Sequence, residues 1–404
     1  MDEGTARKPS GLKVFGIISS ALFASLLAVI LLLAYVGSAK LQRLRRDARE
    51  RLTEIRNSDP ARPTLRGSSE PGNAWDDYEA ALKSVAAYAN ANKMIPWIPI
   101  GPKANPEAVQ KALIDLAGAI DQIHQGARRG TSRRLYEWEK GSPMPLPPLA
   151  ACSHMVQLLG AKARRLAGEG KGREAAGALL DALQFSRDLG SDGVLICEMI
   201  STSTIGSSLE SMVDLLAAGT FDKDALADLD RGLEVLDRTM PDHGKTMMYD
   251  SFLLGGMMDD TAIGSWGPQR LLYANAVEAT DEMLARAAAA EALPWSEAQA
   301  VYQEIEATAL KTWNPITKIA SSSHLKTSRH VRFCRAQLRL LRTAVHQQAT
   351  GELLDLDDPF GSKLKTSASE SGRKYWSVGP DGTDDGGNGI WKEGGKDILL
   401  DAKK

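Results

Sequence analysis

The residues best suited to chemistry are three aspartates near the C-terminus, Asp381, Asp384 and Asp385, which lie within residues 381–385 on a glycine-rich turn. Carboxylates held this close repel one another unless they share a hard cation that prefers oxygen ligands, such as Ca²⁺. The turn is not an EF-hand loop, because its third and twelfth positions are Thr383 and Lys392. Two interpretations therefore stay open, a calcium-type loop and a solvated acidic turn.

Other motifs for catalysis or nucleotide binding are incomplete. Gly244-Lys245-Thr246 matches the end of a phosphate-binding loop, but Thr239 takes the place of its first glycine and a helical pattern precedes it. Asp121 and His124 have the spacing of a di-iron helix motif, which needs a second such motif, and the sequence contains none. The chain also lacks His-Glu-x-x-His and Gly-x-Ser-x-Gly. We expect neither catalysis nor nucleotide binding.

The C-terminal segment carries a longer pattern around the acidic turn. It reads Asp358-Pro359-Phe360-Gly361, then Tyr375-Trp376-Ser377-Val378-Gly379-Pro380-Asp381-Gly382, then Asp384-Asp385-Gly386-Gly387 and Lys396-Asp397-Ile398. This pattern resembles the C-terminal part of the major pseudopilin of type II secretion systems. It also resembles the ending of many uncharacterised, membrane-anchored helical proteins of planctomycete and myxobacterial type.

In the pseudopilin family the acidic loop binds calcium through carboxylates and backbone carbonyls. The resemblance therefore implies a set of oxygen ligands for Ca²⁺, which are Asp381, Asp384, Asp385 and Asp397, with Ser377 nearby. It covers only residues 359–404, and Gly11-Leu12 is not followed by the glutamate of a prepilin cleavage site. What the resemblance implies is a shared metal-loop module.

The composition limits the class of protein. The chain has 404 residues, of which 43% are hydrophobic and 25% charged, so it is neither disordered nor a polytopic membrane protein. Its 49 Lys and Arg against 51 Asp and Glu leave a net charge of −2, which provides no basic field for nucleic acid. Three cysteines are too few and too scattered for a disulfide framework or a zinc site.

An uncharged apolar stretch over residues 14–36 follows a short tail, residues 1–13. At about 1.5 Å per residue it spans the hydrocarbon core of a bilayer, about 30 Å thick. A cleaved signal peptide is the alternative, but the apolar part of such peptides runs to about 7–15 residues. We expect an uncleaved signal anchor, followed by a basic juxtamembrane helix (37–56) that touches anionic lipid.

The sequence patterns that indicate on which side of the membrane the C-terminal part lies conflict. The excess of Lys and Arg after the span would place the large C-terminal part in the cytoplasm. A basic tail directly before a long apolar run is typical of a translocating anchor, and weak calcium sites suit the extracytoplasmic face. We expect a single-pass protein of the bacterial inner membrane with a periplasmic C-terminal domain.

The rest of the chain reads as mainly α-helical. A linker rich in Pro, Arg, Ser and Gly (57–73) precedes an all-α domain (74–351). Expected helices cover residues 106–128, 150–169, 172–188, 194–218, 222–238, 267–290, 296–313 and 316–350. The segment 166–190 resembles one tetratricopeptide unit, so an irregular bundle and a tetratricopeptide-like array both remain open. Residues 359–404 form a small β-element, with strands expected at 374–378 and 398–400.

These patterns predict a membrane-anchored structural or interaction protein with a calcium-stabilised C-terminal loop, linked to secretion or envelope assembly. Its partners would be membrane lipid, through residues 14–36 and the basic helix, and an unidentified protein. Two alternatives stay open. One is a cytoplasmic-facing helical solenoid that holds peptides, and the other is a membrane-tethered enzyme of unfamiliar type, which would need polar side chains converging in a deep pocket.

Overall fold

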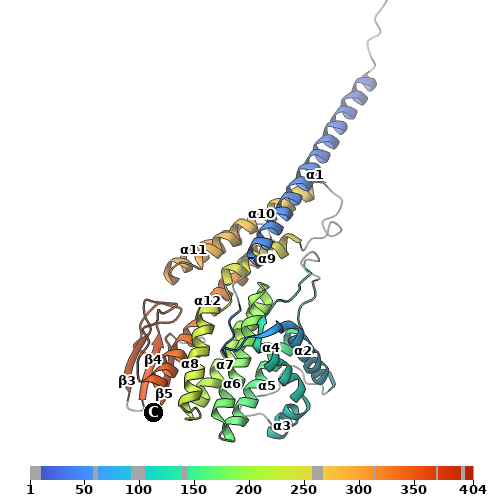
Figure 1. Ribbon diagram of the computed structural model, residues 1–404. Helices are drawn as coiled ribbons and strands as arrows, with labels where there is room; N and C mark the ends of the chain where they lie inside the picture. The colour runs from blue at the N-terminus through green and yellow to red at the C-terminus, as the bar shows by residue number, and fades with distance from the viewer. Residues whose placement is uncertain are drawn as a thin grey trace, which may run out of the picture.

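The computed structural model describes residues 11–57, 62–91, 105–137, 144–256, 267–312, 315–369, 372–392 and 396–403, so most of the expected tail (1–13) lies outside it. Within these ranges the chain is 71% helical, with twelve helices and a small three-stranded sheet near the C-terminus (Figure 1). The prediction of a mainly α fold with a small C-terminal β-element is therefore confirmed.

The helix boundaries follow the hydrophobic periodicity of the sequence. The helices are α1 (Gly11–Asn57), α2 (Ala74–Ala91), α3 (Pro106–Asp115), α4 (Ala117–Arg128), α5 (Leu149–Gly168), α6 (Gly172–Ser191), α7 (Leu195–Ala217), α8 (Lys223–Thr239), α9 (His243–Gly256), α10 (Gly267–Ala290), α11 (Trp295–Lys311) and α12 (Pro315–Thr350). From α5 onward, each expected boundary lies within three residues of the observed one, but α9 was not expected. The expected helix 106–128 is wrong as a single element, because the backbone at Leu116 (φ −105°, ψ 15°) leaves the helical region between α3 and α4.

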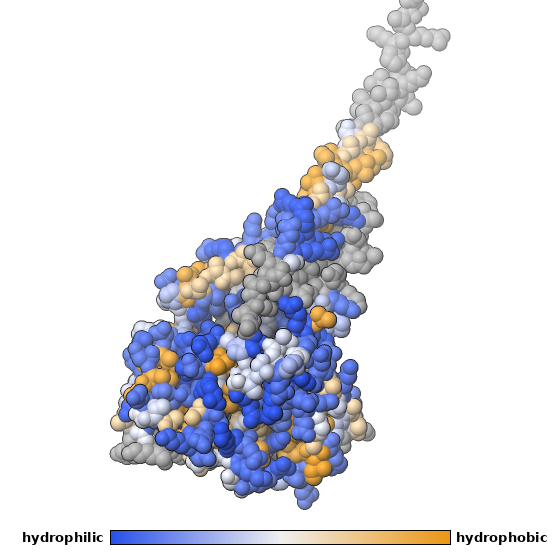
Figure 2. Space-filling model, in the orientation of Figure 1, coloured by the Kyte–Doolittle hydropathy of each residue, from blue (hydrophilic) through white to orange (hydrophobic). Residues whose placement is uncertain are grey.

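The first helix, α1, contains both the expected span and the expected juxtamembrane helix. No proline interrupts its 47 residues, so the backbone hydrogen bonds continue without a break. Its N-terminal part projects from the body as a rod, on which apolar side chains such as Tyr35, 74% exposed, face outward (Figures 1 and 2). Among the described helices, α1 alone is long and apolar enough to cross a membrane.

The C-terminal part of α1 packs on α10. A Cβ at Gly37 would lie 2.5 Å from the backbone nitrogen of Leu271, so only glycine allows the two helices to come this close. Leu41 is buried against α10, and Lys40 forms an ion pair with Glu278. One side of the expected lipid-facing basic helix therefore contacts protein.

The second half of the expected linker is ordered and packs on α6. Leu65 is buried, and its backbone N–H donates to Gln184 Oε1 at 2.8 Å. Further along, strand β1 (Glu70–Asn73) pairs in parallel with β2 (Arg129–Thr131) at the end of α4. This pair was not expected, since neither short strand alternates apolar and polar residues.

A buried carboxylate, Asp188 on α6, joins this segment to the helices. Its oxygens accept hydrogen bonds from Arg62 Nε and from an Arg187 terminal nitrogen, both at 3.1 Å. The Tyr78 hydroxyl donates at 2.9 Å and the Gln184 amide at 3.0 Å. Burial alone would raise the pKa of Asp188, but the two arginine charges outweigh it and lower that pKa. One charge thus connects the pre-helical segment, α2 and α6.

The C-terminal sheet shares the core of the helical body. Its antiparallel strands are β3 (Lys365–Ser369), β4 (Gly372–Ser377) and β5 (Ile398–Lys403), in the order β3-β4-β5. Three buried side chains of the sheet belong to one apolar cluster with side chains of α6, α7, α8 and α12; the three are Tyr375, Ile398 and Leu400. Phe360, before β3, and Val378, after β4, belong to the same cluster. The C-terminal β-element is therefore built into the main core of the helical body.

Candidate functional site

The glycine-rich acidic loop connects β4 to β5 and crosses closely over the start of β5. A Cβ at Gly379 would lie 1.9 Å from the Lys396 carbonyl oxygen, and one at Gly389 would lie 1.8 Å from that of Asp397. Both positions therefore require glycine. These two close approaches bring the acidic turn against Asp397, which follows it at the entry to β5.

The structure brings together two of the five predicted ligands, Asp385 and Asp397. Asp397 is fully buried, and its oxygens accept from the backbone N–H of Gly387 at 2.8 Å and of Asp385 at 3.4 Å. Asp385 Oδ2 is buried without a hydrogen-bond partner, while Oδ1 lies 3.6 Å from Lys396 Nζ. A buried carboxylate oxygen with no donor is an incomplete arrangement, and a cation that prefers oxygen ligands would complete it.

The other three predicted ligands have partners elsewhere. Asp384 accepts from Trp376 Nε1 at 2.9 Å and pairs with Lys365 at 3.1 Å; these contacts, led by the indole hydrogen bond, lower its pKa. Asp381 accepts from the Thr383 backbone N–H at 2.9 Å. In the described chain, which omits 393–395, no three or more His, Cys, Asp or Glu side chains are placed to hold a metal. Of the predicted ligands, Asp385 and Asp397 are therefore the pair placed to share a cation.

The fifth predicted ligand, Ser377, takes part in a buried turn at Asp358. The Ser377 hydroxyl donates to Asp358 Oδ1 at 2.7 Å, and the backbone N–H groups of Phe360 and Val378 each donate to this carboxylate at 2.9 Å. Burial raises the pKa of Asp358, although these hydrogen bonds oppose the rise. The Asp-Pro-Phe-Gly turn therefore holds the end of β4 in place under the loop.

The loop is fixed to the helical body by side chains of α11 and α12. Trp295 Nε1 donates to the Pro380 carbonyl at 2.8 Å, and its ring packs edge-on against Phe360 at 5.4 Å. On α12, Gln337 donates to the Trp391 carbonyl at 2.6 Å. The acidic loop therefore keeps a defined position relative to the body.

A second polar cluster, which the sequence did not predict, lies in a pocket of about 470 Å³ between α4, α5 and α6. Lys162 Nζ lies 2.9 Å from His124 Nε2, and His124 Nδ1 lies 2.5 Å from Asp181 Oδ2. Asp181 is fully buried and also pairs with Arg66 at 3.1 Å. Burial lowers the pKa of Lys162 despite the carboxylates near it.

This lysine–histidine–aspartate chain can share protons, but it selects no class of ligand. The cations and carboxylates around the pocket balance; they are Arg66, Arg128 and Lys162 against Asp121, Glu174 and Asp181. The spacing of Asp121 and His124 on α4 was the only sequence pattern near it. Asp181 follows His124 by 57 residues, and no local pattern indicates that they meet.

A third polar cluster holds α9 against α7 and α12. His243 Nδ1 lies 2.8 Å from Glu198 Oε2, and His324 Nε2 lies 3.2 Å from Asp250 Oδ2. Burial opposes protonation of His243, but the charge of Glu198 outweighs it and raises the pKa of His243. Glu198 Oε1 and His324 Nδ1 have no hydrogen-bond partner. These pairs connect α9, which also contacts α1, to the main bundle.

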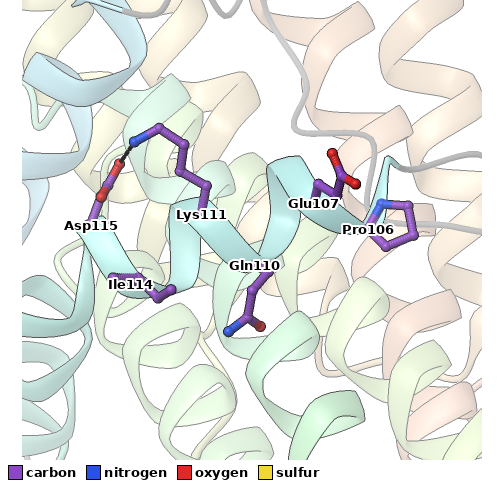
Figure 3. Close-up of a pocket in the computed structure, with 6 residues that line it drawn as sticks. All are labelled: Pro106, Glu107, Gln110, Lys111, Ile114 and Asp115. Atoms are coloured by element: carbon purple, nitrogen blue, oxygen red, sulfur yellow. Dashed lines mark hydrogen bonds and ion pairs between the residues drawn. The ribbon is translucent and has the colours of Figure 1, made fainter.

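A further hollow, of about 490 Å³, lies along α3 (Figure 3). All six lining residues come from that one helix, and Lys111 and Asp115 pair with each other at 2.5 Å. Because no other element among the described residues contributes a side chain, no set of described polar groups converges on this surface.

Comparison of the chain with protein-family models, with curated proteins and with solved structures found no match.

Proposed function

We propose that this chain is a single-pass membrane protein in which α1 holds a folded interaction domain close to the bilayer. The observation that carries the proposal is the continuity of α1. Its outward-facing apolar part and its packed basic part are one helix. A rod of exposed side chains such as Phe23, Leu31 and Tyr35 is unfavourable in water and favourable in lipid. The helix then continues into the body, so the domain is tied directly to its anchor.

The body would act by contact with another protein on the extracytoplasmic face. Three clusters of charged side chains in the described chain are used to join elements, around Asp188, Asp181 and His243. A structural or interaction role, linked to secretion or envelope assembly, is consistent with charged clusters that join elements, and it requires no catalysed reaction.

Calcium in the C-terminal loop would complete this domain. Asp385 and Asp397 would hold the ion, which would supply positive charge to two neighbouring carboxylates. The unpartnered Asp385 Oδ2 supports this assignment. Millimolar calcium, present outside the cytoplasm, suffices for weak sites of this kind, so the loop also favours the extracytoplasmic side.

Protease accessibility tests the topology. Cells expressing the full chain are converted to spheroplasts and treated with external protease, with a C-terminal tag as the reporter. Loss of the tag, together with resistance of the protein to carbonate extraction, is the expected result. Protection of the tag in intact spheroplasts, with digestion after lysis, would instead establish the cytoplasmic-facing scaffold. Complete release by carbonate would exclude the anchor.

Thermal unfolding tests the metal. The full chain in detergent should unfold at a higher temperature with Ca²⁺ than with chelator, since at 100 times Kd a ligand adds about 2.7 kcal/mol of stability. Asp385→Asn and Asp397→Asn should abolish the shift, and Asp401→Asn, an exposed aspartate on β5, should preserve it. The calcium assignment fails if the unsubstituted chain shows no shift.

A further inference from the structure

The position of α10 beside α1 carries an inference that rests on the proposed membrane anchoring. α1 and α10 run in the same direction where they touch. Ser38 accepts from Arg270 at 3.0 Å, Lys40 donates to Asn275 at 2.7 Å, and Arg43 donates to Glu278 at 3.2 Å. The paired residues differ in number by 232, 235 and 235, so this offset holds along the contact.

The offset places the start of α10 at the level of the apolar rod. Subtracting about 234 from Gly267, the first residue of α10, gives a level near Leu33 of α1, inside the expected span. Leu272 lies near the level of Ser38, two positions past Val36, which is the last exposed large apolar side chain of α1 among the described ones. The first two turns of α10 thus lie alongside the end of the span.

Close contact between the helices keeps these turns next to the span. The missing side chain at Gly37 lets the backbone of Leu271 approach α1 directly. Leu272 is 51% exposed, whereas Tyr273 and Ala274, which follow it on α10, are buried with Leu41 of α1. Its neighbour Arg270 bonds Ser38 at the same level. An apolar side chain and an arginine at this depth suit the boundary between the acyl and headgroup layers of a bilayer.

We propose that the first two turns of α10, through Leu272 and Arg270, are a second contact with the lipid bilayer beside α1. Phospholipid is the partner, because these turns are continuous with the lipid-exposed rod and with the exposed basic side chains of Arg43 and Arg46. With α1 in a bilayer, these cations would lie near the anionic headgroups. The body is then held to the membrane at two neighbouring points.

Site-directed spin labels on the reconstituted full chain test this contact. Leu31→Cys, Leu272→Cys and Ala279→Cys each receive a nitroxide in vesicles of phosphatidylethanolamine and phosphatidylglycerol. Ala279 is the matched control, because it is exposed on the same face of α10, two turns and about 10 Å farther along. The unsubstituted chain provides the labelling blank, since all three native cysteines are buried.

Collisions with oxygen, which is enriched in lipid, are compared with collisions with a water-soluble nickel complex. The oxygen-to-nickel ratio should be severalfold higher at 272 than at 279, and highest at 31. A high ratio at 31 with equal, low ratios at 272 and 279 overturns the α10 contact and leaves the anchor intact. Protection of 272 from both reagents also overturns it, because protein then covers the site. A low ratio at 31 refutes the proposed anchoring itself.

Discussion

Replacing Asp188 with asparagine removes the single negative charge shared by two buried arginines. The side chains of Arg62 and Arg187 are 8% and 3% exposed, so water cannot replace the lost carboxylate. The asparagine amide also presents a donor where Tyr78 and Gln184 donate. Leaving a buried charge without its partner costs about 3–5 kcal/mol, and we expect Asp188→Asn to lower the free energy of unfolding by that amount.

The pH dependence of this effect follows from the lowered pKa of Asp188. A carboxyl group whose pKa is lower in the folded state stabilises the fold above its unfolded pKa, near 3.8. That contribution disappears as pH falls through the still lower folded pKa. The difference between the unsubstituted chain and Asp188→Asn should therefore be constant near neutrality and should shrink below about pH 4.

Urea unfolding of the full chain in detergent, followed by tryptophan fluorescence, measures the difference. The control is Asp224→Asn, because Asp224 is 77% exposed and lies 4.0 Å from Arg173. An exposed pair of this kind contributes about 0–1 kcal/mol. If Asp188→Asn loses less than about 1 kcal/mol, or no more than Asp224→Asn, the carboxylate does not hold the segment to α6 and the reasoning is wrong.

Three further predictions concern other parts of the molecule. The pKa of His243 is raised in the folded state, so its protonated form stabilises the fold below pH 6.5, its ordinary pKa. This stabilisation disappears as pH rises through the higher folded pKa, and Glu198→Gln should abolish the dependence in urea unfolding between pH 5 and 9. Gly37→Val should destabilise the packing of α1 on α10 by about 1–3 kcal/mol, while the neighbouring exposed Ala39→Val should have little effect; equal stability of the two variants would contradict the close contact. Burial raises the pKa of every cysteine thiol, so a thiol reagent should modify the chain only in denaturant, and reaction of the folded chain would contradict that burial; the thiols are Cys152, Cys197 and Cys334.

The helices could be predicted because their apolar residues repeat at helical spacing and their ends carry stop and start residues. Gly170 and Gly219, just past the ends of α5 and α7, have positive φ angles of 75° and 67°. Asp222 caps α8 by accepting from the Ala225 backbone N–H at 2.8 Å. The break at Leu116 escaped prediction because no proline marks it, and Gly118 lies inside α4.

The polar clusters could not be predicted from the sequence, because their members are far apart in the chain. Arg62 and Asp188 are separated by 126 positions, and nothing local indicates that they pair. The acidic loop was located correctly, but residue types could not show that Asp384 pairs with Lys365 while Asp385 lies beside Asp397. The packing of the C-terminal sheet into the helical core could not be predicted for the same reason, since Trp295 and Pro380, which form a hydrogen bond, are 85 positions apart.

The unbroken helix from the rod into the body has a mechanical consequence. A helix without a hinge transmits rotation and tilt, whereas a flexible linker at the membrane surface would absorb them. With α1 in a bilayer, the tilt of this one helix would set both the distance of the C-terminal sheet from the membrane and its orientation. Copies in the same membrane would then present that sheet at a common height above the bilayer.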